Sequence, residues 1–132
     1  MSGYSGTPLP KKLGIKPGHR VLLLSAPEHF ALGDLPDDVT VVRRLSGKAD
    51  VLVSFHTERA DLAKRMPKLR EAMEPAAGLW IAWPKRASKV PTDLTEDVVR
   101  DLALENVLVD NKVAALDETW SGLRLVIRLR DR

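Results

Sequence analysis

Two short, continuous apolar runs constrain the fold of this chain more than any other feature. They are Val21–Leu24 and Gly78–Trp83, with Gly18 before the first and Pro84 directly after the second. A short apolar run between residues that interrupt regular structure is typical of a strand buried on both faces. The two runs therefore predict a sheet with covered faces, which is the centre of an α/β fold.

Two more strands are predicted between these runs, at Val39–Arg44 and Asp50–Phe55. Only Leu45–Ala49 joins them. A parallel crossover usually needs about a dozen residues or more, so the short connection favours an antiparallel hairpin. The family resemblance described below favours two parallel strands instead, and the sequence leaves both arrangements open.

Two helices are predicted. The first follows Thr57, whose hydroxyl is suited to cap it, and Pro67 is expected to kink this helix or split it in two. Its apolar residues share one stripe, formed by Leu62, Met66, Leu69 and Met73. The second helix is expected to begin at Asp93–Glu96, which has the form of a capping box, and to end near Asn106.

The end of the chain predicts an antiparallel hairpin. Leu123–Leu129 alternates between apolar residues and a more polar set, as in an antiparallel strand with one solvated face, and Val107–Leu116 precedes it. Residues 1–12, with several Gly and Pro, are expected to form an extended arm. Residues 13–132 are expected to form a single Rossmann-like α/β domain, with a mixed sheet of about six strands, two main helices and the C-terminal antiparallel hairpin.

The composition limits the class of protein to which the chain can belong. Its 132 residues carry a formal net charge of +3 and include no cysteine, which excludes disulfides and cysteine-based metal sites. No apolar run approaches the roughly 20 residues that span a bilayer, and the N-terminus lacks the apolar core of a signal peptide. A cytoplasmic protein without membrane contact is expected. The basic excess is too mild to indicate nucleic acid as a partner, and the oligomeric state is left undetermined.

Three stretches resemble the class I S-adenosylmethionine-dependent methyltransferases. Ile15–Leu22 is similar to the lead-in to their first strand, and Ala49–Val53 is similar to their fourth strand. Leu69–Ile81 is similar to their helix, glycine-containing turn and fifth strand. The resemblance implies a Rossmann-like fold with its middle trimmed, in which the terminal hairpin corresponds to strands six and seven.

A second resemblance covers nearly the whole chain. It is to a bacterial family of uncharacterised proteins, domain of unknown function family 3052. The similar segments are Ser2–Leu9, Trp83–Lys85, Pro91–Asp97, Val109–Lys112 and Asp117–Leu123. This resemblance supports the fold and implies no activity.

The chain departs from the methyltransferase pattern at the cofactor-binding segments. Strand one is followed by Ser25–Phe30, with no glycine before Gly33, and Pro27 lacks the backbone N–H that a cofactor loop would use. Strand two ends in Arg43–Arg44, where those enzymes have an acidic residue for a ribose hydroxyl. No cofactor is therefore expected, and an enzyme is not favoured.

The loop after the second apolar run is the strongest candidate for a binding site. Ligands of open α/β sheets bind beyond the carboxyl ends of the strands. The candidate residues of this loop are Trp83, Lys85, Arg86 and Lys89. Three cations ahead of a helix start favour a phosphate or carboxylate, and Trp83 would supply a stacking surface. The alternative is an ordinary solvated basic loop.

A second candidate lies before the hairpin turn, at Asp117, Glu118 and Trp120. Paired carboxylates are suited to bind a metal or to act as acid and base. The alternative is that Asp117 accepts backbone N–H bonds of the turn.

A third candidate is the polar triplet Asp110, Asn111 and Lys112, which interrupts a strand. Either a β-bulge or a binding site would explain it. The histidines show no spacing typical of metal ligands, so no metal site is predicted. Together these features favour a binding module that recognises an anionic small molecule or a protein partner through its strand-end loops. A diverged S-adenosylmethionine-dependent methyltransferase-like enzyme is the alternative.

Overall fold

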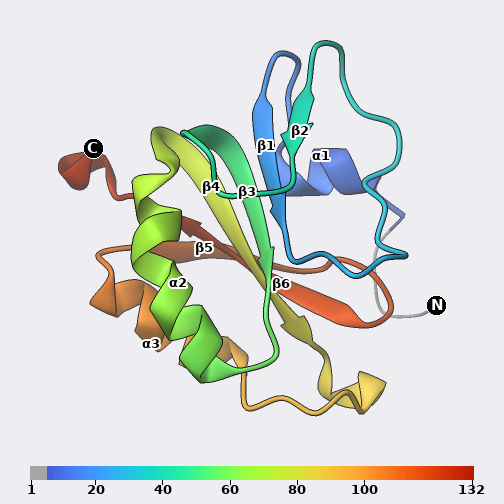
Figure 1. Cartoon of the computed structure of the whole chain (residues 1–132), viewed down its shortest axis with the longest axis vertical. Helices are drawn as coiled ribbons and strands as arrows, with labels where there is room; N and C mark the ends of the chain where they lie inside the picture. The colour runs from blue at the N-terminus through green and yellow to red at the C-terminus, as the bar shows by residue number, and fades with distance from the viewer. Residues whose placement is uncertain (1–5) are drawn as a thin grey trace.

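A six-stranded mixed sheet forms the centre of the computed structural model, which describes residues 6–132 (Figure 1). The strand order is β2-β1-β3-β4-β6-β5. The first four strands are parallel, and β6 runs antiparallel to both β4 and β5. The strands are β1 (Arg20–Leu24), β2 (Thr40–Val42), β3 (Ala49–Phe55), β4 (Met73–Pro84), β5 (Val109–Ala115) and β6 (Trp120–Val126).

Helices cover the two faces of the sheet unequally. The two long helices, α2 (Arg59–Glu71) and α3 (Glu96–Glu105), lie side by side on one face, and the short α1 (Leu9–Leu13) lies on the other (Figure 1). Two 3₁₀ turns, Arg86–Ser88 and Leu129–Asp131, complete the regular structure of the described residues. Within residues 6–132, no helix is long and apolar enough to cross a membrane.

Alternate residues of the central strands supply two separate cores. Leu22, Leu52 and Leu79 face α2 and α3, and are fully buried. Their neighbours Val21 and Val53 face the opposite side, where α1 and the segment after β1 cover them. Burial on both faces is the reason that these strands read as continuous apolar runs. The predicted α/β fold with a Rossmann-like sheet and a C-terminal antiparallel pair is confirmed.

Of the two arrangements left open for β2 and β3, the structure has the parallel one and not the hairpin. Both strands pair in parallel with β1, which lies between them. The short connection suffices because β2 has only three residues, and its last residue Val42 is followed by Ala49 after seven peptide steps. Such a segment spans up to about 23 Å, enough to cross one strand and return to the start of β3 without a helix.

The two helix starts differ from those predicted. Thr57 does not cap α2, whose first backbone N–H, on Arg59, instead donates to Asp93 Oδ1 at 2.7 Å. Asp93 does not cap α3, because Thr95 Oγ1 accepts from the N–H of Val98. Pro67 lies inside α2, which continues through it as one helix. The acidic residue predicted to start one helix therefore caps the other.

Several boundaries also shift. The last predicted strand, Leu123–Leu129, corresponds to β6, which covers Trp120–Val126. Strand β4 begins at Met73, five residues before the predicted Gly78, and pairs with the start of β3 through a register shift. The predicted extended arm at residues 1–12 includes most of α1, whose Leu13 is fully buried against the sheet. The rest of that prediction, at residues 1–5, lies outside the described residues.

Candidate functional site at the ends of β1 and β3

The strand order of the sheet changes direction between β1 and β3. From β1 the chain passes to β2 on one side, and then crosses to β3 on the other. In open α/β sheets, the crevice beyond the carboxyl ends of such a strand pair is the usual place for a ligand. In this chain Ser25 follows β1, and His56 follows β3.

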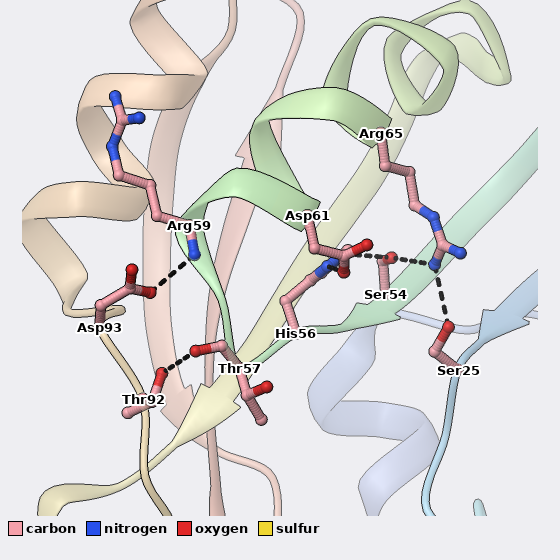
Figure 2. A network of polar contacts seen from close by, with 9 residues as sticks. All are labelled: Ser25, Ser54, His56, Thr57, Arg59, Asp61, Arg65, Thr92 and Asp93. Atoms are coloured by element: carbon pink, nitrogen blue, oxygen red, sulfur yellow. Dashed lines mark hydrogen bonds and ion pairs between the residues drawn. The ribbon is translucent and has the colours of Figure 1, made fainter.

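A buried histidine organises the end of β3. Ser54 and His56 lie two residues apart, so both side chains point to the face that carries α2, and neither residue is more than 2% exposed. His56 Nε2 lies 2.7 Å from Ser54 Oγ, and His56 Nδ1 lies 2.6 Å from Asp61 Oδ2 on the first turns of α2 (Figure 2). The three side chains therefore form one hydrogen-bonded network under α2.

The protonation state of His56 in this network follows from its surroundings. Burial lowers the pKa of His56, although the hydrogen bond and charge of Asp61 act in the opposite direction. His56 is therefore neutral at pH 7, and the proton lies on Nδ1, because the carboxylate of Asp61 only accepts. Nε2 then accepts the hydroxyl proton of Ser54.

Arg65 joins the ends of the two strands. Its Nη1 donates to Ser54 Oγ at 3.2 Å and to Ser25 Oγ at 3.1 Å, so one guanidinium from α2 spans β3 and β1 (Figure 2). Ser25 has a φ of 58°, the left-handed conformation that glycine adopts without strain. The backbone thus makes a left-handed turn directly after β1, although the sequence has no glycine there.

A cavity of about 360 Å³ lies beside this network. Its lining residues are Leu45, Asp61, Lys64, Arg65 and Lys68. The side chain of Asp61 is 61% exposed, whereas Ser54 and His56 are closed to solvent. A ligand in this cavity would therefore meet the guanidinium of Arg65 and the carboxylate of Asp61, and Ser54 is too buried to act as a nucleophile on it.

The loop that starts α2 is fastened to the loop that starts α3. Thr92 Oγ1 donates to the carbonyl of Thr57 at 2.6 Å, next to the Arg59–Asp93 contact (Figure 2). These two contacts hold the α2 N-terminus, and with it Asp61, against the end of the sheet. Among the described residues, no group of three His, Cys, Asp or Glu side chains is placed to hold a metal ion.

The structure places three of the four candidate residues of the basic loop around one cavity. Trp83, Arg86 and Lys89 line a cavity of about 480 Å³ together with Thr95 and Glu96 at the start of α3. Lys85 is not among its lining residues, and its backbone N–H donates to the carbonyl of Thr119. An anionic ligand of this loop stays a prediction.

Asp117 and Trp120 each make a structural contact at the turn that precedes β6. Asp117 Oδ1 accepts the backbone N–H groups of Thr119 and Trp120, at 2.8 and 2.7 Å, which is the turn-forming role. The ring of Trp120 packs edge-on against Phe55, with centroids 5.1 Å apart. Glu118 is exposed.

The triplet in β5 contains a β-bulge. The register shifts between Asp110 and Lys112, so that Asn111 is unpaired and its two neighbours point to opposite faces of the sheet. Asp110 Oδ2 lies 3.2 Å from Arg100 Nε on α3, whereas Lys112 lies 6.0 Å from the ring of Trp80 on the other face. Of the two explanations for this triplet, the bulge is present.

Comparison with known proteins is informative about the fold. No family model matches the sequence, and no curated protein sequence matches it. Among solved structures 122 chains match. One is a SAM-dependent methyltransferase from Aquifex aeolicus, with a TM-score of 0.61 and 17% identity over 89% of this chain and 87% of that chain.

The chain has a methyltransferase-like Rossmann fold. Magnesium protoporphyrin IX methyltransferase from Synechocystis PCC 6803, solved with bound SAM, has a TM-score of 0.57 and 13% identity over 85% of this chain and 71% of its own. A Burkholderia thailandensis didemethyltoxoflavin N1-methyltransferase with bound S-adenosylhomocysteine has a TM-score of 0.60 and 13% identity, over 89% of this chain and 73% of that chain. Membership of domain of unknown function family 3052 stays a prediction.

The hydrogen-bonded network at the ends of β1 and β3 was not among the predicted site residues. Its members come from three separate elements, and none belongs to a recognisable motif. One signal was present: Ser54 and His56 are polar residues two apart at the end of an apolar strand, which places both on one covered face. Buried polar side chains need partners, and that need predicts a polar contact from the following helix.

Proposed function

We propose that this chain is a diverged S-adenosylmethionine-dependent methyltransferase-like enzyme, with its cofactor site at the carboxyl edge between β1 and β3. The observation that carries the proposal is the position of Arg65, which joins Ser25 after β1 to Ser54 on β3. Ligands of this class of sheet bind where the strand order reverses. Structures of similar fold contain bound SAM or S-adenosylhomocysteine at low sequence identity, which supports the same choice of ligand.

The charged groups beside this edge suit the amino-acid end of the cofactor. The guanidinium of Arg65 uses only Nη1 for the two serines, so its other nitrogens are the group that would bind a carboxylate. Asp61, on the same cavity, is the group that would bind the ammonium. His56 holds the carboxylate of Asp61 in place. Bound in this way, SAM supplies a methyl group on a positively charged sulfur.

The departures noted in the sequence limit what else the chain can hold. Pro27 provides no backbone N–H after β1, and Arg43–Arg44 follows β2 where an acidic residue would bind a ribose. Phe30 and Leu32 of the same segment are buried in the core. Arg65 and Asp61 are therefore the residues assigned to the cofactor, and none is assigned to its ribose.

Isothermal titration with SAM and with S-adenosylhomocysteine tests this proposal. We expect saturable binding of both, and a Kd at least tenfold weaker for Arg65→Gln, because the glutamine keeps a hydrogen-bond donor and loses the charge. Arg130→Gln is the matched control, since Arg130 is exposed near the C-terminus and its loss should change the Kd less than twofold. Absence of saturable binding to either compound would contradict the proposal.

A second candidate function is the binding of an anionic small molecule by the cavity at Trp83. The observation that favours it is the convergence of Arg86 and Lys89 with that indole on one cavity. An aromatic carboxylate would combine stacking on Trp83 with charge pairing to the two cations. Titration with 2-hydroxybenzoate, followed by tryptophan fluorescence, should lose its signal in both Trp83→Phe and Arg86→Ala/Lys89→Ala. An unchanged titration in Arg86→Ala/Lys89→Ala would exclude this candidate.

A further inference from the structure

A second group of cations gathers on the face of the sheet that lacks the long helices. Here α1 lies against the end of β5, and the two segments exchange hydrogen bonds: Lys12 Nζ donates to the carbonyl of Ala115 at 2.8 Å, and Lys112 Nζ donates to the carbonyl of Lys12 at 3.2 Å. Between them is a cavity of about 280 Å³. Its lining residues are Lys11, Lys12, Leu13, Gly14, Asn111, Lys112 and Arg124.

Every charged residue that lines this cavity is a cation. Four of its seven residues are Lys or Arg, and none is Asp or Glu. None of the ion pairs found in residues 6–132 includes Lys11, Lys112 or Arg124. Like charges held together without an acidic partner oppose folding, so the arrangement would be relieved by a bound anion.

The strand pairing brings two of these cations together. Lys112 and Arg124 are direct partners in the β5–β6 ladder. Without the bulge at Asn111, Lys112 would lie on the same face as Asp110, which pairs with Arg100. Because of the bulge, Asp110 and Lys112 lie on opposite faces of the sheet, and only Lys112 lies on the face with the cavity.

The neighbouring strand leaves room for the guanidinium. Gly78 on β4 lies under Arg124, and a Cβ at this position would come within 2.5 Å of Arg124 Nε. Burial and the nearby Arg132 both lower the pKa of Arg124, and burial together with Lys112 and Lys85 lowers that of Lys12. Both groups are therefore partly buried close to other cations.

We propose that this cavity is a second binding site, for the phosphate groups of a small oligophosphate ligand. Several converging ammonium and guanidinium groups, with an amide donor at Asn111, match adjacent phosphates better than a single carboxylate. The site lies on the opposite face from α2, so it goes beyond the proposed cofactor site. A free pyrophosphate and a nucleoside diphosphate present the same chemistry to it.

Titration calorimetry with inorganic pyrophosphate, ADP and adenosine tests the site. We expect pyrophosphate and ADP to bind saturably and adenosine not to bind. Lys112→Gln/Arg124→Gln should weaken pyrophosphate binding at least tenfold. The matched control Lys16→Gln/Lys48→Gln removes the same charge from exposed positions, and should change the affinity less than twofold. A tighter Kd for ADP than for pyrophosphate would identify a nucleotide as the preferred source of the phosphates.

A further variant keeps every charge. Gly78→Ala should displace the guanidinium of Arg124, and so weaken pyrophosphate binding, while a circular dichroism spectrum matching the parent reports that the sheet is intact. Equal weakening by the site and control variants, or no saturable binding of pyrophosphate, would overturn the proposal. Tighter binding of a short DNA duplex than of pyrophosphate, with a steep salt dependence, would overturn it in favour of a nucleic-acid surface. SAM titration of Lys112→Gln/Arg124→Gln should match the parent, which separates this site from the cofactor site.

Discussion

The imidazole of His56 and the carboxylate of Asp61 lie 2.6 Å apart across the turn that joins β3 to α2. The imidazole is closed to solvent, and the carboxylate side chain is 61% exposed. This contact therefore runs from the interior of the protein to its surface. It also makes folding sensitive to the protonation of one buried histidine.

The first prediction concerns the dependence of stability on pH. In the unfolded chain His56 takes up a proton near its ordinary pKa of 6.5, whereas burial keeps its pKa lower in the folded protein. Between those two values the unfolded state binds more protons, so the free energy of unfolding should fall as the pH drops below about 6.5. Urea denaturation at pH 7.5 and 5.5 measures this difference. The free energy of unfolding of His56→Gln should differ less between the two pH values. An equal difference in both proteins would contradict the assignment to His56.

The second prediction concerns the hydroxyl inside the network. Ser54→Ala removes the donor to His56 Nε2 and the acceptor for Arg65, and so leaves buried polar atoms without partners. It should lower the free energy of unfolding by about 1–3 kcal/mol. Ser46→Ala, in the β2–β3 connection, is the control and should change it by less than about 0.5 kcal/mol. Equal values for the two variants would show that the network adds no stability.

The third prediction concerns the cap that α2 receives from another loop. Asp93 Oδ1 accepts the N–H of Arg59, so Asp93→Ala should destabilise the protein by about 1 kcal/mol, a typical value for loss of a helix cap. Thermal denaturation measures the loss. Asp34→Ala removes the same charge from an exposed loop and should leave the melting temperature unchanged. Thr57→Val should also have little effect on α2, because its hydroxyl does not cap the helix.

The sheet was predictable because its signals are local. Val21–Leu24 and Gly78–Trp83 are apolar on both faces, and that pattern depends only on burial. The β2–β3 connection was not predictable from loop length, because a strand of three residues removes the need for a long crossover. The capping residue of α2 could not be found either, since Asp93 is 34 positions from Arg59.

The cavities depend on residues that the fold brings together from distant positions. Arg86 and Lys89 were identified because they are close in sequence and follow a strand. Lys12 and Lys112 are 100 positions apart, and nothing local predicts that α1 packs against β5. The role of Arg65 could not be predicted for the same reason, since its partner Ser25 is 40 positions away in the sequence. Mild overall charge is therefore compatible with strong local clustering.

The fourth prediction concerns the packing of Gly122 on β6 against the central tryptophan. A Cβ at this position would lie 3.0 Å from Trp80 Cε3 and 3.1 Å from two atoms of Leu116. The indole has little freedom to move away, since it is fully buried and its Nε1 donates to the carbonyl of Leu13. Gly122→Ala should therefore destabilise the protein by about 1–3 kcal/mol, as expected for overpacking of a core.

Urea denaturation followed by tryptophan fluorescence checks this value. Gly6→Ala is the control, because no atom beyond its chain neighbours lies within 4 Å of a Cβ added there. The variant should also shift the emission of Trp80, since the added methyl group presses on its ring. The hydrogen bond of that indole reaches α1, so a displaced Trp80 would loosen the helix that carries Lys12. Pyrophosphate binding by Gly122→Ala should consequently weaken together with its stability. Full stability with unchanged fluorescence would show that β6 can move away from Trp80, and that the two sheet faces are less tightly coupled than the contacts imply.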